Sequence, residues 1–177
     1  CYEDIPVGFK QDSDFFDAVD VRKACYWSVF AGGFGVTYGN HCIWSMNEEP
    51  GLYYPMHWKD ALRRPAAGQM KHLRQLMESR PFFERIPDQS LLVDNYEGYN
   101  HQQAARGEDY AFIYAPHGIF VKVRLGVLEG KSVKVSWFNP RTGETSPVGI
   151  FENTGEQTFI PPGHGREQDY VLILDSE

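Results

Sequence analysis

Apolar residues are densest early in the chain, and their spacing predicts a buried helix followed by a short strand. Residues 20–31 carry apolar side chains on more than one face, which is typical of a helix buried on at least two sides. The pair Gly32-Gly33 ends this helix, because glycine adopts a left-handed conformation at low cost. A short β run at 34–38 follows, and Gly39-Asn40 turns the chain into a loop. This order is typical of the last unit of a (β/α)8 barrel, whose active face is built by the loops after the strands.

A second helix is expected at 66–79, after a long loop at 39–57 and a short helical turn at 58–63. Pro65 suits the first turn of this helix, and the residue before Pro81 ends it. Its apolar residues fall at helical spacing, and they are Met70, Leu73, Leu76 and Met77.

Beyond Pro81 the apolar pattern changes from a helical period to an alternating one. The alternation predicts short strands at 110–115, 119–125, 133–138 and 170–174, whereas 94–109 is polar and predicts a long loop. Strands at this spacing indicate a small antiparallel β-sandwich. The residues expected to face its core are Val121, Val123, Val135, Trp137 and Leu172.

These patterns divide the chain into residues 1–81 and residues 82–177, with an α+β fold class. The first part has the terminal βα units of a (β/α)8 barrel but cannot close a barrel by itself. The second part is the antiparallel β-sandwich. If the rest of a barrel is absent, the apolar helix at 20–31 needs another cover, either the sandwich or a second copy of the chain.

Composition and charge exclude several classes of protein. Of the 177 residues, 42% are hydrophobic and 23% are charged, which is typical of a globular domain. The net charge is −7 and no basic cluster occurs, so a nucleic-acid partner is not expected. No apolar run is long enough to span a membrane. The histidines are scattered, and the cysteines (Cys1, Cys25 and Cys42) are irregularly spaced, so we expect free thiols, no metal site and no cofactor.

Several motifs resemble the apiosidase-like glycoside hydrolases, a family of bacterial (β/α)8-barrel enzymes often labelled as endoglucanases. In the first part of the chain they are CYED at 1–4, DVRKACYWSVFAG at 20–32, TYGNH at 37–41, IW at 43–44, QM at 69–70 and LMESRP at 76–81. This match continues through RIPDQ at 85–89, and a second set follows with WFNPRTG at 137–143, FIPPG at 159–163 and DYVL at 169–172. The second set is similar to a β-sandwich that follows the barrel and is labelled a collagen-binding domain.

The resemblance implies a retaining glycoside hydrolase that acts on the side chains of plant or other polysaccharides, in the periplasm or outside a bacterial cell. In the family, a Glu-Pro pair directly before the CYE motif supplies the expected nucleophile, and the partner acid comes from an earlier strand. Both precede Cys1. The chain is therefore expected to be the C-terminal portion of such an enzyme and to be inactive alone, because hydrolysis needs two carboxyl groups on opposite sides of the bond.

Four residues are candidates for a sugar site. Tyr38 ends the short β run, and His41 and Trp44 follow it, so their side chains are placed to bind substrate in the intact enzyme; a packed loop is the alternative. Glu3 is the one carboxylate close to the expected chemistry, although a hydrogen-bonding role suits it better than that of a nucleophile. Arg22 is expected to form a structural ion pair.

The sandwich leaves a second class of function open. It could be an autonomous module that binds carbohydrate or collagen, or a structural brace on the barrel. Trp137 lies on an alternating strand, which favours a core position over sugar binding. Binding through the sandwich requires an open row of two or three aromatic rings.

Overall fold

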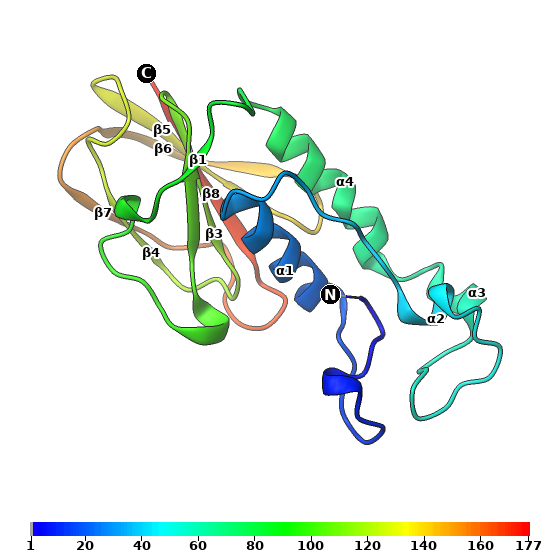
Figure 1. Ribbon diagram of the computed structural model, residues 1–177. Helices are drawn as coiled ribbons and strands as arrows, with labels where there is room; N and C mark the ends of the chain where they lie inside the picture. Colours follow the sequence, from blue (N-terminus) through cyan, green and yellow to red (C-terminus); the bar gives the residue numbers. More distant parts are fainter. Residues whose placement is uncertain (1) are drawn as a thin grey trace.

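The computed structural model describes residues 2–177 and has a mixed α+β architecture (Figure 1). The α-helices are α1 (Ala18–Phe30), α2 (His41–Trp44), α3 (Trp58–Ala61) and α4 (Pro65–Glu78). Short 3-10 helices are η1 (Val7–Phe9), η2 (Gln89–Leu91) and η3 (Gly98–Asn100). The strands are β1 (Ile86–Pro87), β2 (Gln103–Arg106), β3 (Tyr110–Ala115), β4 (Val121–Arg124), β5 (Ser132–Phe138), β6 (Thr145–Glu152), β7 (Glu156–Phe159) and β8 (Tyr170–Ser176).

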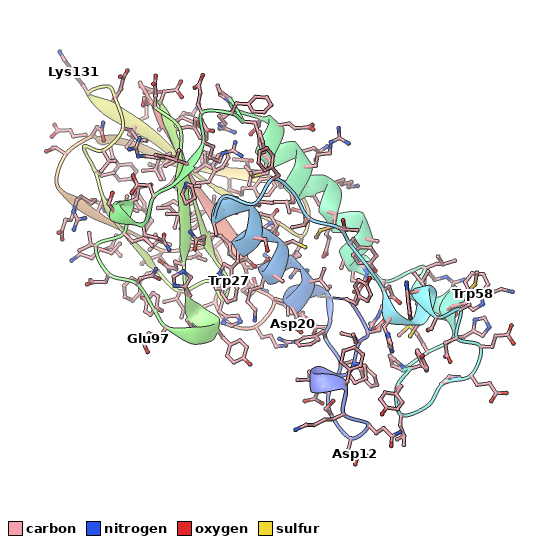
Figure 2. All side chains as sticks on the ribbon, in the orientation of Figure 1. Asp12, Asp20, Trp27, Trp58, Glu97 and Lys131 are labelled. Atoms are coloured by element: carbon pink, nitrogen blue, oxygen red, sulfur yellow. The ribbon has the colours of Figure 1, made fainter. Side chains whose placement is uncertain are left out.

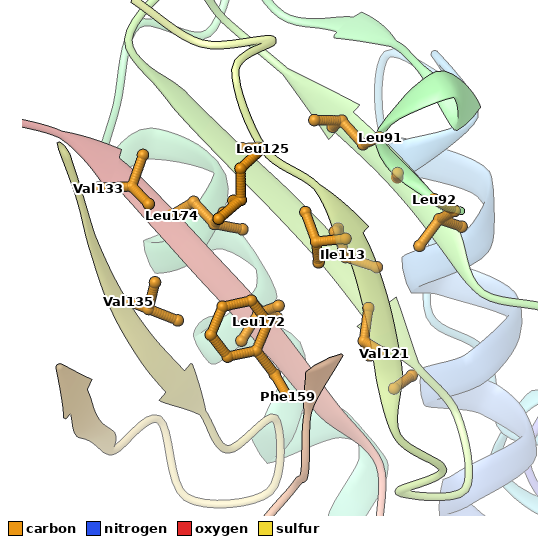
Figure 3. Close-up of a cluster of buried hydrophobic side chains, with 14 of the residues drawn as sticks. Leu91, Leu92, Ile113, Val121, Leu125, Val133, Val135, Phe159, Leu172 and Leu174 are labelled. Atoms are coloured by element: carbon orange, nitrogen blue, oxygen red, sulfur yellow. The ribbon is translucent and has the colours of Figure 1, made fainter. Parts of the chain in front are cut away.

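The strands form two antiparallel sheets. The larger sheet has the order β1-β2-β3-β8-β5-β6, and the smaller sheet pairs β4 with β7. Figure 3 shows the hydrophobic cluster between them, in which Leu172 and Val135 of the larger sheet face Val121 and Phe159 of the smaller one. All five residues expected in the sandwich core are at most 4% exposed and belong to this cluster, which confirms that prediction.

The opposite face of the larger sheet is covered by α1 and α4, which lie along it in Figure 1. Tyr26 of α1 stacks on Tyr114 of β3 with ring centroids 4.9 Å apart, and Phe30 stacks on Phe112 at 6.0 Å. Because both faces of β3 are covered, all six of its residues are buried. The helix expected at 20–31 therefore packs on the sandwich, and its buried residues are not available as a surface for self-association.

Helix α1 begins and ends as its sequence predicts. The Asp17 side chain accepts hydrogen bonds from the N–H groups of Val19 and Asp20, and the Asp20 carboxylate accepts one from the Asp17 N–H, which completes a capping box. Gly32 follows the helix with a φ of 97°, the left-handed conformation that favours glycine. The helices expected at 58–63 and 66–79 are present as α3 and α4.

Three local predictions were wrong. Residues 34–38 form no strand, because none of the described residues pairs with their backbone, and Phe34 is 90% exposed. The long loop expected at 39–57 contains α2, and the loop expected at 94–109 contains β2, which pairs with β3. Cys1 lies outside the described residues, while Cys25 and Cys42 are free and buried.

Candidate functional site

The candidate site is built where the start of the chain meets the segment after α1. Glu3 and Asn40 form an isolated parallel bridge. The Glu3 N–H donates to the Gly39 carbonyl at 2.9 Å, and the His41 N–H donates to the Glu3 carbonyl at 2.9 Å. A Cβ added at Gly39 would lie 2.2 Å from the Tyr2 ring, so this close approach requires glycine. The bridge fixes the side chains of both segments relative to one another.

The Glu3 carboxyl group is buried and incompletely bonded. The residue is 0% exposed, and its Oε2 accepts a hydrogen bond from the Tyr38 hydroxyl at 2.7 Å. Its Oε1 has no hydrogen-bond partner among the described residues. Burial raises the pKa of Glu3 above its ordinary value, the neighbouring Asp4 charge adds to this shift, and the Tyr38 hydrogen bond opposes it. Burial and the same contact raise the pKa of Tyr38.

Asp4 lies next to Glu3 in sequence but is fully paired. Its carboxylate accepts hydrogen bonds from Arg64 Nε at 2.8 Å and from Asn40 Nδ2 at 2.7 Å, and the terminal nitrogen Nη2 of Arg64 completes a bidentate ion pair. Asp4 is 0% exposed and has a φ of 63°. Arg64 precedes α4, so this ion pair connects the first residues of the chain to that helix.

Asn40 also places His41. The Asn40 side chain accepts a hydrogen bond from the Ile43 N–H at 3.1 Å and so caps α2. The His41 ring is stacked on Tyr54 at a centroid distance of 4.7 Å and meets the edge of Phe9 at 6.4 Å. His41 is 8% exposed, and burial lowers its pKa, although the Asp4 charge opposes the shift. Its ring is therefore neutral at pH 7.

The structure brings together two of the three residues expected to bind sugar, through Glu3. The Tyr38 hydroxyl donates to the Glu3 side chain, and the backbone N–H of His41 donates to the Glu3 carbonyl, while the His41 ring packs on Tyr54 and Phe9. Trp44, at the end of α2, is instead 73% exposed. Sequence reasoning missed the roles of Asp4, Asn40 and Arg64. Asn40 alone carried a local signal, because asparagine is a favoured N-cap; the two other partners are 60 residues apart.

A groove lies beside this site, between residues 34–38 and α4. It has a volume of about 750 Å³ and is mainly apolar, with Phe34, Val36, Met70, Leu73 and Phe83 among its lining residues. Arg22 of α1 lies beneath α4 and forms the expected ion pair, with Asp169. Within residues 2–177, no three His, Cys, Asp or Glu side chains are arranged to hold a metal ion. No helix in the same range is both long and apolar enough to cross a membrane.

Two solved structures are similar to the chain over 99% of its length. One is named a glycoside hydrolase, with 37% identity and a TM-score of 0.93, and the chain covers 41% of it. The other is a glycoside hydrolase family 5 protein from Bacteroides vulgatus ATCC 8482, with 35% identity and a TM-score of 0.92, and the chain covers 40% of it. The chain thus spans about two fifths of the length of these proteins.

Two family models divide the chain between them. Residues 1–84 match the model described as "Apiosidase-like, catalytic domain". Residues 86–175 match the "Putative collagen-binding domain of a collagenase". Residues 1–84 therefore belong to the apiosidase-like family, and residues 86–175 belong to the family of the second model. No curated protein matches the chain. The site around Glu3 lies in the part that matches the catalytic domain, and the sheets lie in the other part.

Proposed function

We propose that the chain is the C-terminal portion of a retaining glycoside hydrolase that acts on polysaccharide side chains. In this proposal residues 1–81 are the last βα units of a (β/α)8 barrel, and residues 82–177 are the sandwich that braces it. The observation that carries the proposal is the parallel bridge between Glu3 and Asn40. Successive strands of such a barrel are parallel, so this bridge is expected where its seventh and eighth strands end.

The open groove supports the same proposal. No residue from 2 to 177 pairs with the backbone of residues 34–38, and Phe34 and Val36 are 90% and 38% exposed. In a closed barrel the preceding strand would pair with this segment, and apolar residues of neighbouring units would cover the groove. The two glycoside hydrolases are more than twice as long as this chain, which leaves room for those units.

The proposal assigns the two catalytic carboxyl groups to the polypeptide before Cys1. Retaining hydrolysis needs a nucleophile and an acid about 5 Å apart on either side of the scissile bond. Asp4 is ion-paired with Arg64 and accepts a hydrogen bond from Asn40, and Glu3 is fully buried and bonded to Tyr38. Glu3 would support the Tyr38 hydroxyl rather than attack the sugar. Tyr38, His41 and Trp44 would line the substrate side, with the Trp44 ring free to stack on a sugar.

The test is an assay of the purified 177-residue chain on aryl glycosides and pectic oligosaccharides. A polypeptide that extends the chain upstream to the length of the two similar hydrolases serves as the positive control. The extended polypeptide should turn over at least one substrate that the short chain does not. Turnover by the short chain within about tenfold of the extended one would overturn the proposal, and Glu3→Gln would then identify whether Glu3 is responsible.

A further inference from the structure

The loop before β2 presents an aromatic ring whose orientation is fixed from one side. Tyr99, in η3, is 75% exposed. The ammonium group of Lys23 lies 4.6 Å from the centroid of its ring and 5.6 Å from that of Trp27. Lys23 itself is only 6% exposed and is paired with Asp20 at 3.7 Å. The cation therefore holds one face of the Tyr99 ring and leaves the other face to solvent.

Trp27 is fixed beside this ring. Its indole N–H donates to the His101 carbonyl at 2.9 Å, and the His101 ring meets the Trp27 ring at 6.2 Å with an interplanar angle of 66°. Figure 2 shows Trp27 on α1 next to the loop that carries Glu97. The donor of the indole is satisfied inside the protein, so the exposed part of Trp27 offers an apolar ring surface.

A second pair of rings extends the surface along the same loop. Tyr96 and Phe120 meet edge to face at 5.9 Å, and Phe120 is 49% exposed. Neutral polar side chains lie between the two pairs of rings. The His101 ring nitrogens lie 3.1 Å from Gln89 Nε2, 3.2 Å from Gln103 Oε1 and 3.4 Å from Asn95 Nδ2. The surface thus combines two exposed rings, Tyr99 and Phe120, and two half-buried ones, Trp27 and Tyr96, with amide and imidazole groups.

We propose that Trp27, Tyr96, Tyr99 and Phe120 form a binding surface for a neutral polysaccharide chain. The face of an aromatic ring carries partial negative charge and attracts the weakly positive C–H groups of a sugar ring. Amide groups beside the rings add polar atoms for sugar hydroxyls, although those of Gln89 and Asn95 also bond to the backbone of residues 102 and 104. The cations that the structure describes around these rings are paired: Lys23 with Asp20, and Lys122 with Asp94 and Glu156, so they do not favour an anionic chain.

This surface is separate from the candidate site. In Figure 2, Trp58, which begins α3, lies at the far end of the molecule from Trp27 and Glu97. Tyr99 and Phe120 are the exposed rings of this surface, and Trp27 and Tyr96 are half-buried beside them. The inference does not depend on hydrolysis, because binding by the 177-residue chain is measured without turnover.

The experiment is affinity electrophoresis of the 177-residue chain in gels that contain xyloglucan, galactomannan, arabinoxylan or hydroxyethylcellulose. The chain should be retarded by at least one of these. Tyr99→Ala should weaken that retardation about tenfold or more, and Lys23→Met should weaken it less, because the ring stays but loses its support. Phe83→Ala is the matched control, since Phe83 is 93% exposed and lies in the groove beside α4.

Gels with polygalacturonate and solutions of a triple-helical Gly-Pro-Hyp peptide test other partners. The proposal is overturned if no neutral polysaccharide retards the chain, or if Tyr99→Ala binds as well as the original chain. Binding only to polygalacturonate or only to the triple-helical peptide would also overturn it. Circular dichroism of each variant shows whether it is folded, and Tyr99→Ala is expected to be, because the side chain lies on the surface.

Discussion

Arg22 and Asp169 form a bidentate ion pair that is almost completely inaccessible to solvent. Arg22 Nε and Nη2 donate to the two carboxylate oxygens at 2.9 and 2.8 Å, and the side chains are 3% and 0% exposed. The two residues are 147 positions apart, one on α1 and the other directly before β8. The pair therefore joins the helical layer to the central strand of the larger sheet.

Replacing Arg22 by methionine should lower the free energy of unfolding by about 3 kcal/mol, because Asp169 would remain buried with fewer partners. Arg141 and Tyr114 still contact Asp169 and limit the loss. Urea denaturation measures the change. Arg74→Met is the control: Arg74 and Glu78 form an exposed pair, and its loss should cost less than about 0.5 kcal/mol. Equal losses of unfolding free energy in the two variants would contradict the prediction that the buried ion pair matters more than the exposed one.

Glu3→Gln should change how stability depends on pH. The pKa of Glu3 is raised in the folded chain, mainly by burial, so folding is favoured by the protonated form. This contribution is fully present below the unfolded pKa and is lost as pH rises through the folded one. Glutamine stays neutral and its side-chain oxygen can still accept the Tyr38 hydrogen bond. The stability of the variant relative to the original chain should therefore increase in urea denaturation as the pH rises above about 4, the ordinary pKa of glutamate. A constant difference would argue against the raised pKa.

His41 and Trp44 should behave differently in the chain alone. His41 packs between Tyr54 and Phe9, so His41→Ala should reduce the free energy of unfolding by about 1 to 3 kcal/mol. Trp44 is 73% exposed, and Trp44→Ala should change it by less than about 0.5 kcal/mol. In an active, extended enzyme both substitutions should lower kcat/KM. Unchanged kinetics in both variants would exclude these residues from the substrate site.

Two glycine substitutions should shift the melting temperature in opposite directions. A Cβ on Gly118 would lie 1.9 Å from the Gly163 carbonyl oxygen, and its φ is 60°, so Gly118→Ala should be strongly destabilising. Gly68 lies within α4 with no atom within 4 Å of an added Cβ. Gly68→Ala should stabilise the chain by about 0.5 to 1 kcal/mol through helix propensity. Calorimetry measures the melting temperature of both variants. A higher melting temperature for Gly118→Ala would contradict the prediction and show that the turn can rearrange.

Helices and strands whose buried side chains recur at a regular spacing could be predicted from the sequence. Leu73, Leu76 and Met77 recur at helical spacing because one side of α4 meets the sheet. Apolar and polar residues alternate along β5 because one face of the strand packs between the two sheets and the other does not. Strand β6 gave no such signal. It is an edge strand with most residues exposed, and Pro147 and Gly149 within it are typical of turns.

The candidate site shows a different limit. The sequence placed Tyr38 and His41 after α1 but could not show what holds them. Tyr38 bonds to Glu3 across 35 residues, and such pairing depends on how the two segments lie in space. The strand expected at 34–38 needs a partner strand for its hydrogen bonds, and the described residues supply none. Local pattern alone cannot reveal either dependence.

The stacking of Tyr26 on Tyr114 and of Phe30 on Phe112 has a consequence for the evolution of these proteins. Each pair takes one ring from the part that matches the catalytic model and one from the part that matches the sandwich model. A gene fusion that joined this sandwich to an unrelated barrel would place four large rings against surfaces not shaped for them. The sandwich and the two helices that cover it, α1 and α4, should therefore be inherited together, and recombination should exchange them as one unit.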